Sequence, residues 1–186
     1  MSDPMLDRKE EWISSGGGPL LVLSVSGLPY WNGSDEPGSG IVPGDQNAPT
    51  DYERACSVQD WVGVIPVGPA DALVLADEPL DTRWWSASEV GPVYLLRWIH
   101  GDTSESVLST LSGLFQHQFK PTGVLFTNDA ERVVLFDSAM PGTDILTPYS
   151  SIELAPGSYR VEVGRFEPNP RTKLLVIRLT RNLETS

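Results

Sequence analysis

Cysteine and histidine are scarce in this chain: its 186 residues include one cysteine, Cys56, and two histidines, His100 and His117. A lone cysteine cannot close a disulfide within the chain, so an oxidising compartment gains no support. Zinc sites need clustered cysteine and histidine ligands, which this spacing does not provide. We therefore expect no metal and no cofactor, and we expect Cys56, near Ala55 and Val58, to be a small buried residue.

Basic residues are also few. The chain has 13 lysines and arginines against 25 aspartates and glutamates, which gives a formal net charge of −12. A surface of this sign repels nucleic acid and anionic membranes and attracts basic proteins. It is equally typical of a soluble protein that has no basic ligand. Charge therefore argues against nucleic-acid binding and leaves a protein partner open.

Long apolar runs are missing as well. The longest, such as Leu20 to Val25, fall far short of the ~20 residues that a membrane-spanning helix needs. The first residues, MSDPMLDRKEEW, lack the apolar core of a signal peptide. We expect a cytoplasmic protein that does not contact membranes.

Three consecutive glycines, Gly16 to Gly18, raise the question of a phosphate-binding loop. Such a loop runs from a strand into a helix, whose N-terminal N–H groups hold the anion. Here Pro19 and the apolar run from Leu20 follow the glycines, and no lysine lies within reach. The pattern predicts a turn that leads the chain into its first strand.

Short apolar segments bounded by glycine, proline and aspartate predict strands along most of the chain. These segments are 19–26, 61–67, 72–76, 93–99, 122–127, 133–136, 151–154, 158–166 and 173–180. We expect 61–67 and 72–76 to form one hairpin. A second hairpin is expected from 122–127 and 133–136. The stretch 77–85 is predicted to be a polar segment that carries two aromatic residues.

One segment, at about 103–117, has the periodicity of a helix. Its apolar residues recur at spacings of three and four, at Val107, Leu108, Leu111, Leu114 and Phe115. Asp102 or Thr103 can cap its start, and His117 at its end is expected to be a solvated or capping residue, where a cation suits the helix dipole. The predicted fold class is α+β: β-rich, mainly antiparallel, with one principal helix.

We expect one domain over 12–182, between a mobile leader, 1–11, and a short tail, 183–186. The segment 30–49 is dense in glycine, proline, asparagine, aspartate and serine, which predicts a long flexible surface loop. Trp12 is expected to anchor the leader on the core.

No enzyme motif stands out. The nucleophile elbow G-x-S-x-G does not occur, and carboxylates are so numerous that a close pair carries little weight. We expect no catalytic residue.

Six ordered strings carry a resemblance to a known family. They are W-x-x-S-x-G-G-P-L-L from Trp12, D-Y-x-R-A-C from Asp51, G-V-I-P-V-G followed by A-L-V-L-A-D-E-P-L from Gly63, R-W-I from Arg97, L-F-D-S-A-M-P-G from Leu135, and L-A-P-G-S-Y-R-V-E from Leu154, ending in R-T-K-L-L. Their order and spacing, over roughly Trp12 to Leu179, resemble the immunity protein 21 family of bacterial polymorphic toxin systems. Ala76 stands where that family usually has glycine.

The resemblance implies an antitoxin that neutralises a secreted toxin by direct binding, with no catalytic residues of its own. The net charge of −12 agrees with a basic, nuclease-like toxin as the partner. The sequence makes no prediction about oligomeric state.

Aromatic residues beside carboxylates suggest where a partner binds, because tryptophan, tyrosine and arginine dominate the energetics of interfaces. Two groups fit this description. The first is Tyr30, Trp31, Asp35 and Glu36, and the second is Asp77, Glu78, Asp81, Trp84 and Trp85. The alternative is that a tryptophan of each group belongs to the core.

Two other functions stay open from the sequence. One is a small acidic hydrolase with paired carboxylates, which a strongly raised carboxylate pKa in an apolar pocket would favour. The other is a generic structural or regulatory domain.

Overall fold

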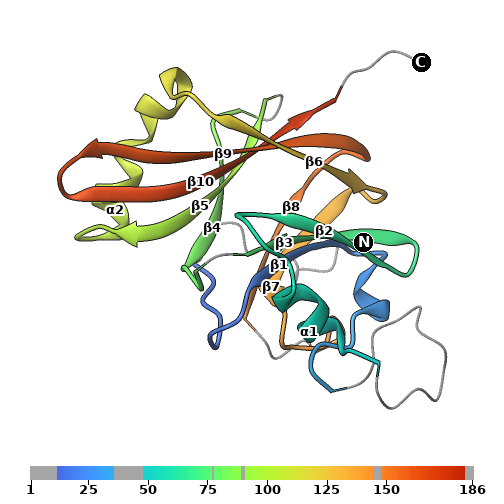
Figure 1. Ribbon diagram of the computed structural model, residues 1–186. Helices are drawn as coiled ribbons and strands as arrows, with labels where there is room; N and C mark the ends of the chain where they lie inside the picture. The colour runs from blue at the N-terminus through green and yellow to red at the C-terminus, as the bar shows by residue number, and fades with distance from the viewer. Residues whose placement is uncertain (1–11, 36–47, 77, 89–90, 145–147, 183–186) are drawn as a thin grey trace, which may run out of the picture.

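The computed structural model describes residues 12–35, 48–76, 78–88, 91–144 and 148–182, and the strands of this part form two antiparallel sheets (Figure 1). The predicted leader, the predicted tail and most of the predicted flexible loop lie outside the described residues. The first sheet has the strand order β2-β3-β1-β7-β8, and the second has the order β4-β5-β10-β9-β6. Within the described ranges, no helix has the length and hydropathy needed to cross a membrane.

The elements are short except in the C-terminal hairpin. The first sheet contains β1 (Leu20–Ser24), β2 (Gly63–Val67), β3 (Ala70–Leu75), β7 (Arg132–Asp137) and β8 (Tyr149–Glu153). The second contains β4 (Thr82–Ser86), β5 (Val93–His100), β6 (Lys120–Asn128), β9 (Gly157–Asn169) and β10 (Thr172–Arg181). The helical elements are η2 (Leu28–Tyr30), α1 (Asp51–Cys56), α2 (Ser104–Leu108) and η3 (Leu111–Gln116). The predicted α+β class is confirmed.

The two sheets pack face to face, and each has its outer face covered. Leu20 and Val22 of β1 meet Leu95 of β5 and Ile177 of β10 in the core between the sheets. On the outer face of the first sheet, apolar residues pack beneath η2 and α1. On the outer face of the second sheet, they pack beneath α2 and η3. The central strands of both sheets are therefore buried on two sides, whereas residues such as Arg160 on β9 are exposed.

This double burial explains the unbroken apolar run in β1. Leu20 and Val22 face the other sheet, whereas Leu21 and Leu23 face outward beneath the helical elements. An antiparallel strand with one solvent-exposed face would alternate apolar and polar residues. Because neither face of β1 is exposed to solvent, both sets of its side chains are apolar.

The principal helical segment is divided into an α-helical turn and a 3-10 turn. Thr103 caps α2, and its side chain accepts a hydrogen bond from the backbone N–H of Ser106. Two residues past α2, the Thr110 hydroxyl donates to the carbonyl oxygen of Val107 at 2.7 Å. Such local bonds compete with α-helical ones, so the chain tightens into η3. Val107, Leu111 and Leu114 remain buried as the periodicity predicts, whereas Phe115 is 63% exposed.

The predicted hairpin between 122–127 and 133–136 is wrong, although both segments are strands. β6 pairs with β9 in the second sheet, whereas β7 pairs with β1 and β8 in the first. Asn128 lies at the crossing, buried, and its Nδ2 donates to the carbonyl oxygens of Ala130 at 2.6 Å and Leu154 at 2.7 Å. The amide satisfies carbonyl groups where the chain leaves one sheet for the other.

The stretch 77–85, predicted to be a polar segment with two aromatic residues, contains the edge strand β4. Trp84 faces the core between the sheets, and Arg83 and Trp85 face outward. Arg83 lies 5.6 Å from the centre of the Trp12 ring, which also packs edge-on against Trp98. Trp12 thus packs on the fold, whereas the leader that it is predicted to anchor lies outside the described residues. Because arginine and tryptophan occupy successive positions of β4, the sequence does not show the apolar and polar alternation that marks a strand.

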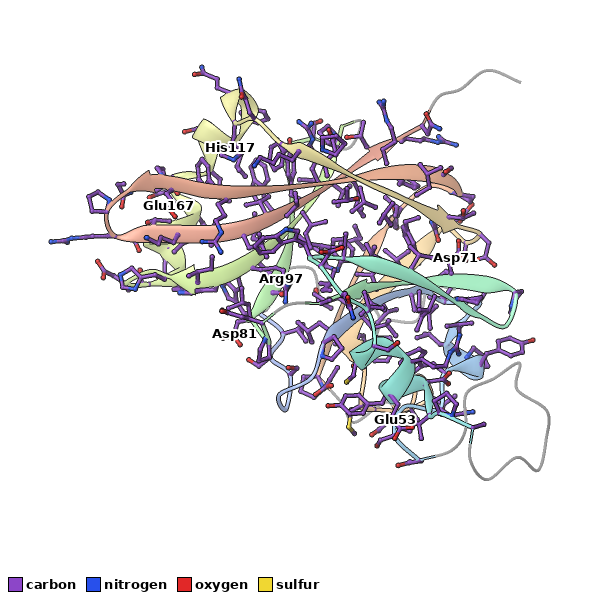
Figure 2. All side chains as sticks on the ribbon, viewed as in Figure 1. Glu53, Asp71, Asp81, Arg97, His117 and Glu167 are labelled. Carbon is purple, nitrogen blue, oxygen red and sulfur yellow. The ribbon has the colours of Figure 1, made fainter. Side chains whose placement is uncertain are left out.

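A buried arginine joins the two sheets. Arg97, on β5 of the second sheet, is fully buried, and its guanidinium donates to the carbonyl oxygens of Leu75, Ala76 and Glu78. These carbonyl groups lie at the end of β3, in the first sheet, and just beyond it. A buried charge is stable only where hydrogen bonds satisfy it. Figure 2 shows Arg97 close to Asp81, where the chain passes from β3 to β4.

Replacing Arg97 with methionine should lower the free energy of unfolding by about 3 kcal/mol, because buried carbonyl groups lose their donors. Urea titration followed by tryptophan fluorescence measures the change. The matched control is Arg160→Met on the exposed surface of β9, which should change stability by less than ~0.5 kcal/mol. Equal losses in the two variants would show that Arg97 does not hold the sheets together.

Candidate partner-binding surface

Two of the predicted contact residues, Trp31 and Trp84, lie in the core. Trp31 is 1% exposed, and its Nε1 donates to the carbonyl oxygen of Ser138 at 3.0 Å. Trp84 is 3% exposed, and its Nε1 lies 3.4 Å from the carbonyl oxygen of Ser150. One tryptophan of each candidate group therefore belongs to the core, and a partner cannot reach either side chain without opening it.

Tyr30 is the exposed aromatic residue of the first group. Its side chain is 45% exposed, and its ring packs on the backbone of Gly68, where a Cβ atom would lie 2.5 Å from the ring carbon Cγ. Asp35 is exposed a few residues further on, and Glu36 lies outside the described residues. The first group thus presents a tyrosine and a carboxylate to solvent.

In the second group, Glu78 and Asp81 are exposed, and Asp77 lies outside the described residues. The backbone of this stretch is fixed on both sides. Glu78 accepts from the Arg97 guanidinium through its carbonyl oxygen, and the carbonyl oxygen of Asp81 accepts from the N–H of Trp98 at 2.8 Å. The two carboxylates therefore extend from a rigid segment.

Trp85, the remaining member of the second group, is half-buried. Its ring centre lies 5.2 Å from that of Tyr94 and 6.0 Å from that of Phe115. The indole thus belongs largely to the apolar layer between the second sheet and η3. Less of this aromatic side chain is free for a partner than the pattern of carboxylates and tryptophans suggests.

Strand β3 separates the two candidate groups. Tyr30 packs on Gly68, in the turn before β3, and Glu78 follows the end of β3. Figure 2 shows Asp71, the second residue of β3, and Asp81 on opposite sides of the molecule. The structure does not bring the two groups together, so they are separate candidates.

Charge is distributed unevenly between the two sheets. The described segments that build and cover the first sheet carry the carboxylates of Asp35, Asp51, Glu53, Asp60, Asp71, Asp129, Glu131, Asp137, Asp144 and Glu153. Their cations, within the described residues, are Arg54 and Arg132. Both are paired, Arg54 with Asp51 at 2.8 Å and Arg132 with Glu153 at 3.8 Å.

The second sheet has a mixed surface. Its strands, covering helical segments and connecting turns carry Arg83, Arg97, Lys120, Arg160, Arg165, Arg171, Lys173, Arg178 and Arg181, beside carboxylates at Glu78, Asp81, Asp102, Glu105, Glu162 and Glu167. The acidic excess of the described chain is therefore concentrated on the first sheet and its covering elements, which we call the acidic half. Figure 2 places Glu53 and Asp71 on this half.

The glycine-rich stretch is a turn, as predicted. The backbone N–H of Gly16 donates to Oδ2 of Asp137 at 2.7 Å, so the anion at these glycines is the chain's own carboxylate. Gly17 has a φ of 125°, and a Cβ atom on Gly18 would lie 2.5 Å from the Tyr52 ring. Gly18 allows close packing against Tyr52, Gly17 supplies the positive φ of the turn, and the Gly16 N–H is engaged by Asp137.

Other residues of the family-like strings also hold the fold. Asp51 is buried and accepts from the backbone N–H of Asn32 at 2.9 Å and from Arg54 at 2.8 Å. Arg54 also donates to the carbonyl oxygen of Pro66 at 2.7 Å, which ties α1 to β2. The hydroxyl of Ser138 donates to the carbonyl oxygen of Pro19 at 2.6 Å. These side chains are engaged within the molecule, so a partner has to contact other residues.

The prediction that Cys56 is buried is wrong, because the structure exposes it at the end of α1. The buried face of this short helix carries Asp51 and Ala55 instead. A hydrogen bond and the charge of Cys56, followed by burial, raise the pKa of the Tyr52 hydroxyl. Cys56 thus has a local packing role beside Tyr52.

His117 is the C-cap residue of η3, as one of the two predicted alternatives has it, and its backbone N–H donates to the carbonyl oxygen of Leu114 at 3.1 Å, but the prediction of a solvated ring is wrong. Its ring packs edge-on against Phe119 and Phe166, and its Nε2 is buried with no hydrogen-bond partner among the described residues. Burial, and then the charge of Arg178, lower the pKa of His117 below its ordinary value of 6.5. A Cβ atom on Gly164 would lie 2.8 Å from Nε2, so glycine there gives the neutral ring its space.

Asp129 is an anion held close to the turn that precedes Tyr30. Burial alone would raise its pKa, but hydrogen bonds from Ser24, Ser26 and its own backbone outweigh burial, and the pKa of Asp129 is lowered. The Ser26 hydroxyl lies 2.7 Å from each carboxylate oxygen. A general acid needs the opposite shift, so Asp129 does not suit a paired-carboxylate hydrolase. The described residues also contain no group of three or more histidines, cysteines or carboxylates placed to hold a metal ion.

Asp71 and Asp129 were not among the residues predicted from the sequence. Both lie in segments with turn composition, which places them near loop tips. Their position close to the Tyr30 turn depends on which strands pair and on where the chain changes sheets. The turn composition around Asp71 and Asp129 indicates that they lie near loop tips, but it does not indicate that these loops lie near Tyr30.

The comparisons with known proteins identify a family. The sequence model described as Immunity protein 21 matches residues 11–172. No curated protein and no solved structure matches the chain. The resemblance drawn from the six strings is confirmed.

The lowered pKa of His117 predicts a component of pH-dependent stability. The unfolded histidine binds a proton near its ordinary pKa of 6.5, and the folded one only at lower pH. The folded state should therefore lose stability as the pH falls from above 6.5 through the lowered pKa. In urea titrations across this interval, His117→Gln should lose less stability than the wild type, whereas the exposed control His100→Gln should follow the wild type. Parallel profiles for all three proteins would contradict the assignment.

Proposed function

Because the chain belongs to the immunity protein 21 family, we propose that it neutralises the toxin of a bacterial polymorphic toxin system by binding the toxin directly. It acts as an antitoxin in the cytoplasm, where an incoming or newly made toxin would do harm. It uses no cofactor and carries out no chemical step. The bound surface covers the site through which the toxin acts.

The observation that carries this proposal is that the side chains of the family-like strings maintain the fold, whereas exposed carboxylates remain on the surface. The side chains of the family-like strings, such as Asp51, Arg97 and Ser138, are buried and bonded inside the fold. The acidic half keeps exposed carboxylates at Asp35, just after the segment whose backbone Asp51 fixes at Asn32, and at Glu53, which also accepts from the Thr50 backbone N–H in the α1 capping box. A rigid fold with charged groups exposed on its surface suits a protein that binds another protein.

The sign of that surface indicates the kind of toxin. An acidic face attracts a basic protein and accelerates its association by electrostatic steering. Enzymes that act on nucleic acid bind their anionic substrate with a basic surface. An acidic antitoxin can occupy such a surface in place of the substrate. We therefore propose a basic, nuclease-like toxin.

Protection should be stoichiometric. When a purified toxin encoded beside this chain's gene is titrated with the antitoxin, residual activity should reach zero near one antitoxin per toxin. Co-expression of the two should restore growth that the toxin alone abolishes. A hydrolase that destroyed the toxin or its product would instead protect far below equal amounts. Failure to protect at any ratio would overturn the proposed function.

Association should depend strongly on salt. Between about 50 and about 500 mM NaCl, the association rate constant should fall at least about tenfold, and the dissociation rate constant should change much less. Stopped-flow mixing with fluorescence detection measures both. A rate constant that does not change with salt would contradict a basic partner surface while leaving direct binding intact.

A further inference from the structure

An exposed patch surrounds Tyr30 on the acidic half. Pro29 and Tyr30 come from η2 and its N-terminal turn, and Gly68 and Pro69 come from the turn between β2 and β3. All four residues are exposed, and we call them the tyrosine patch. No described residue forms a hydrogen bond with the Tyr30 hydroxyl. The ring therefore offers an apolar face and an available polar tip.

The patch is rigid because its neighbours are buried. The backbone N–H of Tyr30 donates to the carbonyl oxygen of Gly27 at 2.9 Å, which closes the η2 turn. Trp31, the next residue, is buried, and its carbonyl oxygen accepts from the N–H of Gly142 at 2.9 Å. The indole of Trp31 thus fixes the backbone from which the Tyr30 side chain extends.

Close backbone approaches seat the ring. Gly68 has a φ of 55°, and any side chain there would collide with Tyr30. A Cβ atom on Gly27 would lie 2.6 Å from Cδ1 of Leu23 and 3.0 Å from Cβ of Ala70. An aromatic side chain held in place before binding loses little conformational entropy when a partner covers it. Rigid, half-exposed aromatic residues are the usual energetic centres of interfaces.

Negative charge lies near the turns that carry the patch. Asp129 is fixed by Ser26 beside the turn that leads to η2. Asp71 follows Ala70 on β3, although the strand alternation directs its side chain to the face that carries Leu73 and Leu75. Arg54, which reaches the neighbouring Pro66, is neutralised by Asp51 at 2.8 Å. This local excess of negative charge favours a cationic partner.

The second candidate group lacks this combination. Trp85 is engaged with Tyr94 and Phe115, and Arg83 lies on the same outward side of β4. Glu78 and Asp81 are well positioned, but no free aromatic ring stands among them. A partner there would gain charge contacts without an apolar anchor.

We infer that the tyrosine patch is the centre of the toxin-binding surface, with the Tyr30 ring inserted into an apolar recess rimmed by basic residues of the toxin. This inference rests on the proposed function and names the binding face for it. Asp129, beside the turn into η2, and Asp71, on the adjoining strand β3, supply the negative charge near the patch that attracts those basic residues. The Glu78–Asp81 segment lies outside the energetic centre.

The test measures affinity for an inactivated form of the toxin domain encoded beside this chain's gene, by isothermal titration calorimetry. Tyr30→Ala should weaken binding at least about 30-fold, and Asp71→Lys about tenfold. Tyr30→Phe keeps the ring and should stay within about fivefold of the wild type. Phe115→Ala and Glu167→Lys are the matched controls on the other sheet, and each should stay within about twofold.

The outcomes distinguish failure of the proposed binding face from failure of the proposed function. If the wild type binds and Tyr30→Ala and Asp71→Lys bind equally well, the tyrosine patch is not the centre and the inference fails alone. Greater losses in Phe115→Ala or Glu167→Lys would overturn it as well. If the wild type itself does not bind, the proposed function fails. Circular dichroism and thermal melting confirm that each variant is folded. If Tyr30→Ala unfolds, the affinities of Tyr30→Phe and Asp71→Lys for the toxin domain are compared to decide whether the tyrosine patch is the centre of the surface.

Discussion

The guanidinium of Arg97 determines how the two sheets meet. It extends from β5 into the first sheet and donates to carbonyl groups at the end of β3 and just beyond it. Because those carbonyl groups are held, the chain turns into β4, and Thr82 can pair with Ile13 at the sheet edge. Ile13 then closes the inner core while Trp12 covers the outer face of the second sheet. A single buried charge thus positions the start of the described chain, the edge of one sheet and the end of the other.

Membership of the family and choice of partner are carried by different residues. The glycines before β1, the Asp51–Arg54 pair and Ser138 are engaged with the backbone or with each other. They identify the fold and, through it, the immunity protein 21 family. Under the proposed function, the residues available to a toxin lie on the surface that is not used in these internal bonds, chiefly on the acidic half. A sequence pattern can therefore reveal the role of the molecule while containing little about which toxin it meets.

Local sequence predicted most strands, because turn residues and apolar runs act over a few positions. It predicted a capped start at Asp102 or Thr103 and the glycine turn for the same reason. It missed the change of sheet at Asn128, since pairing partners lie far apart in the chain and the loop composition resembles that of a hairpin. It also misjudged the burial of the His117 ring and of Cys56, because burial depends on what other segments cover. Among the aromatic candidates, the structure shows which ring of each pair is exposed, because it places Trp31 and Trp84 in the core.

The order in which the strands are made differs from the order in which they lie. The first sheet takes β1 to β3 and then β7 and β8, and the second takes β4 to β6 and then β9 and β10. The last strand synthesised, β10, is the middle strand of the second sheet. Until the ribosome has completed it, β5 and β9 have no neighbour between them, and the inner face of the first sheet lacks its cover. Such non-local pairing slows folding and leaves apolar surface open to aggregation. The molecule therefore gains its structure late in translation, and a stop codon before Thr172 removes the centre of a sheet rather than its edge.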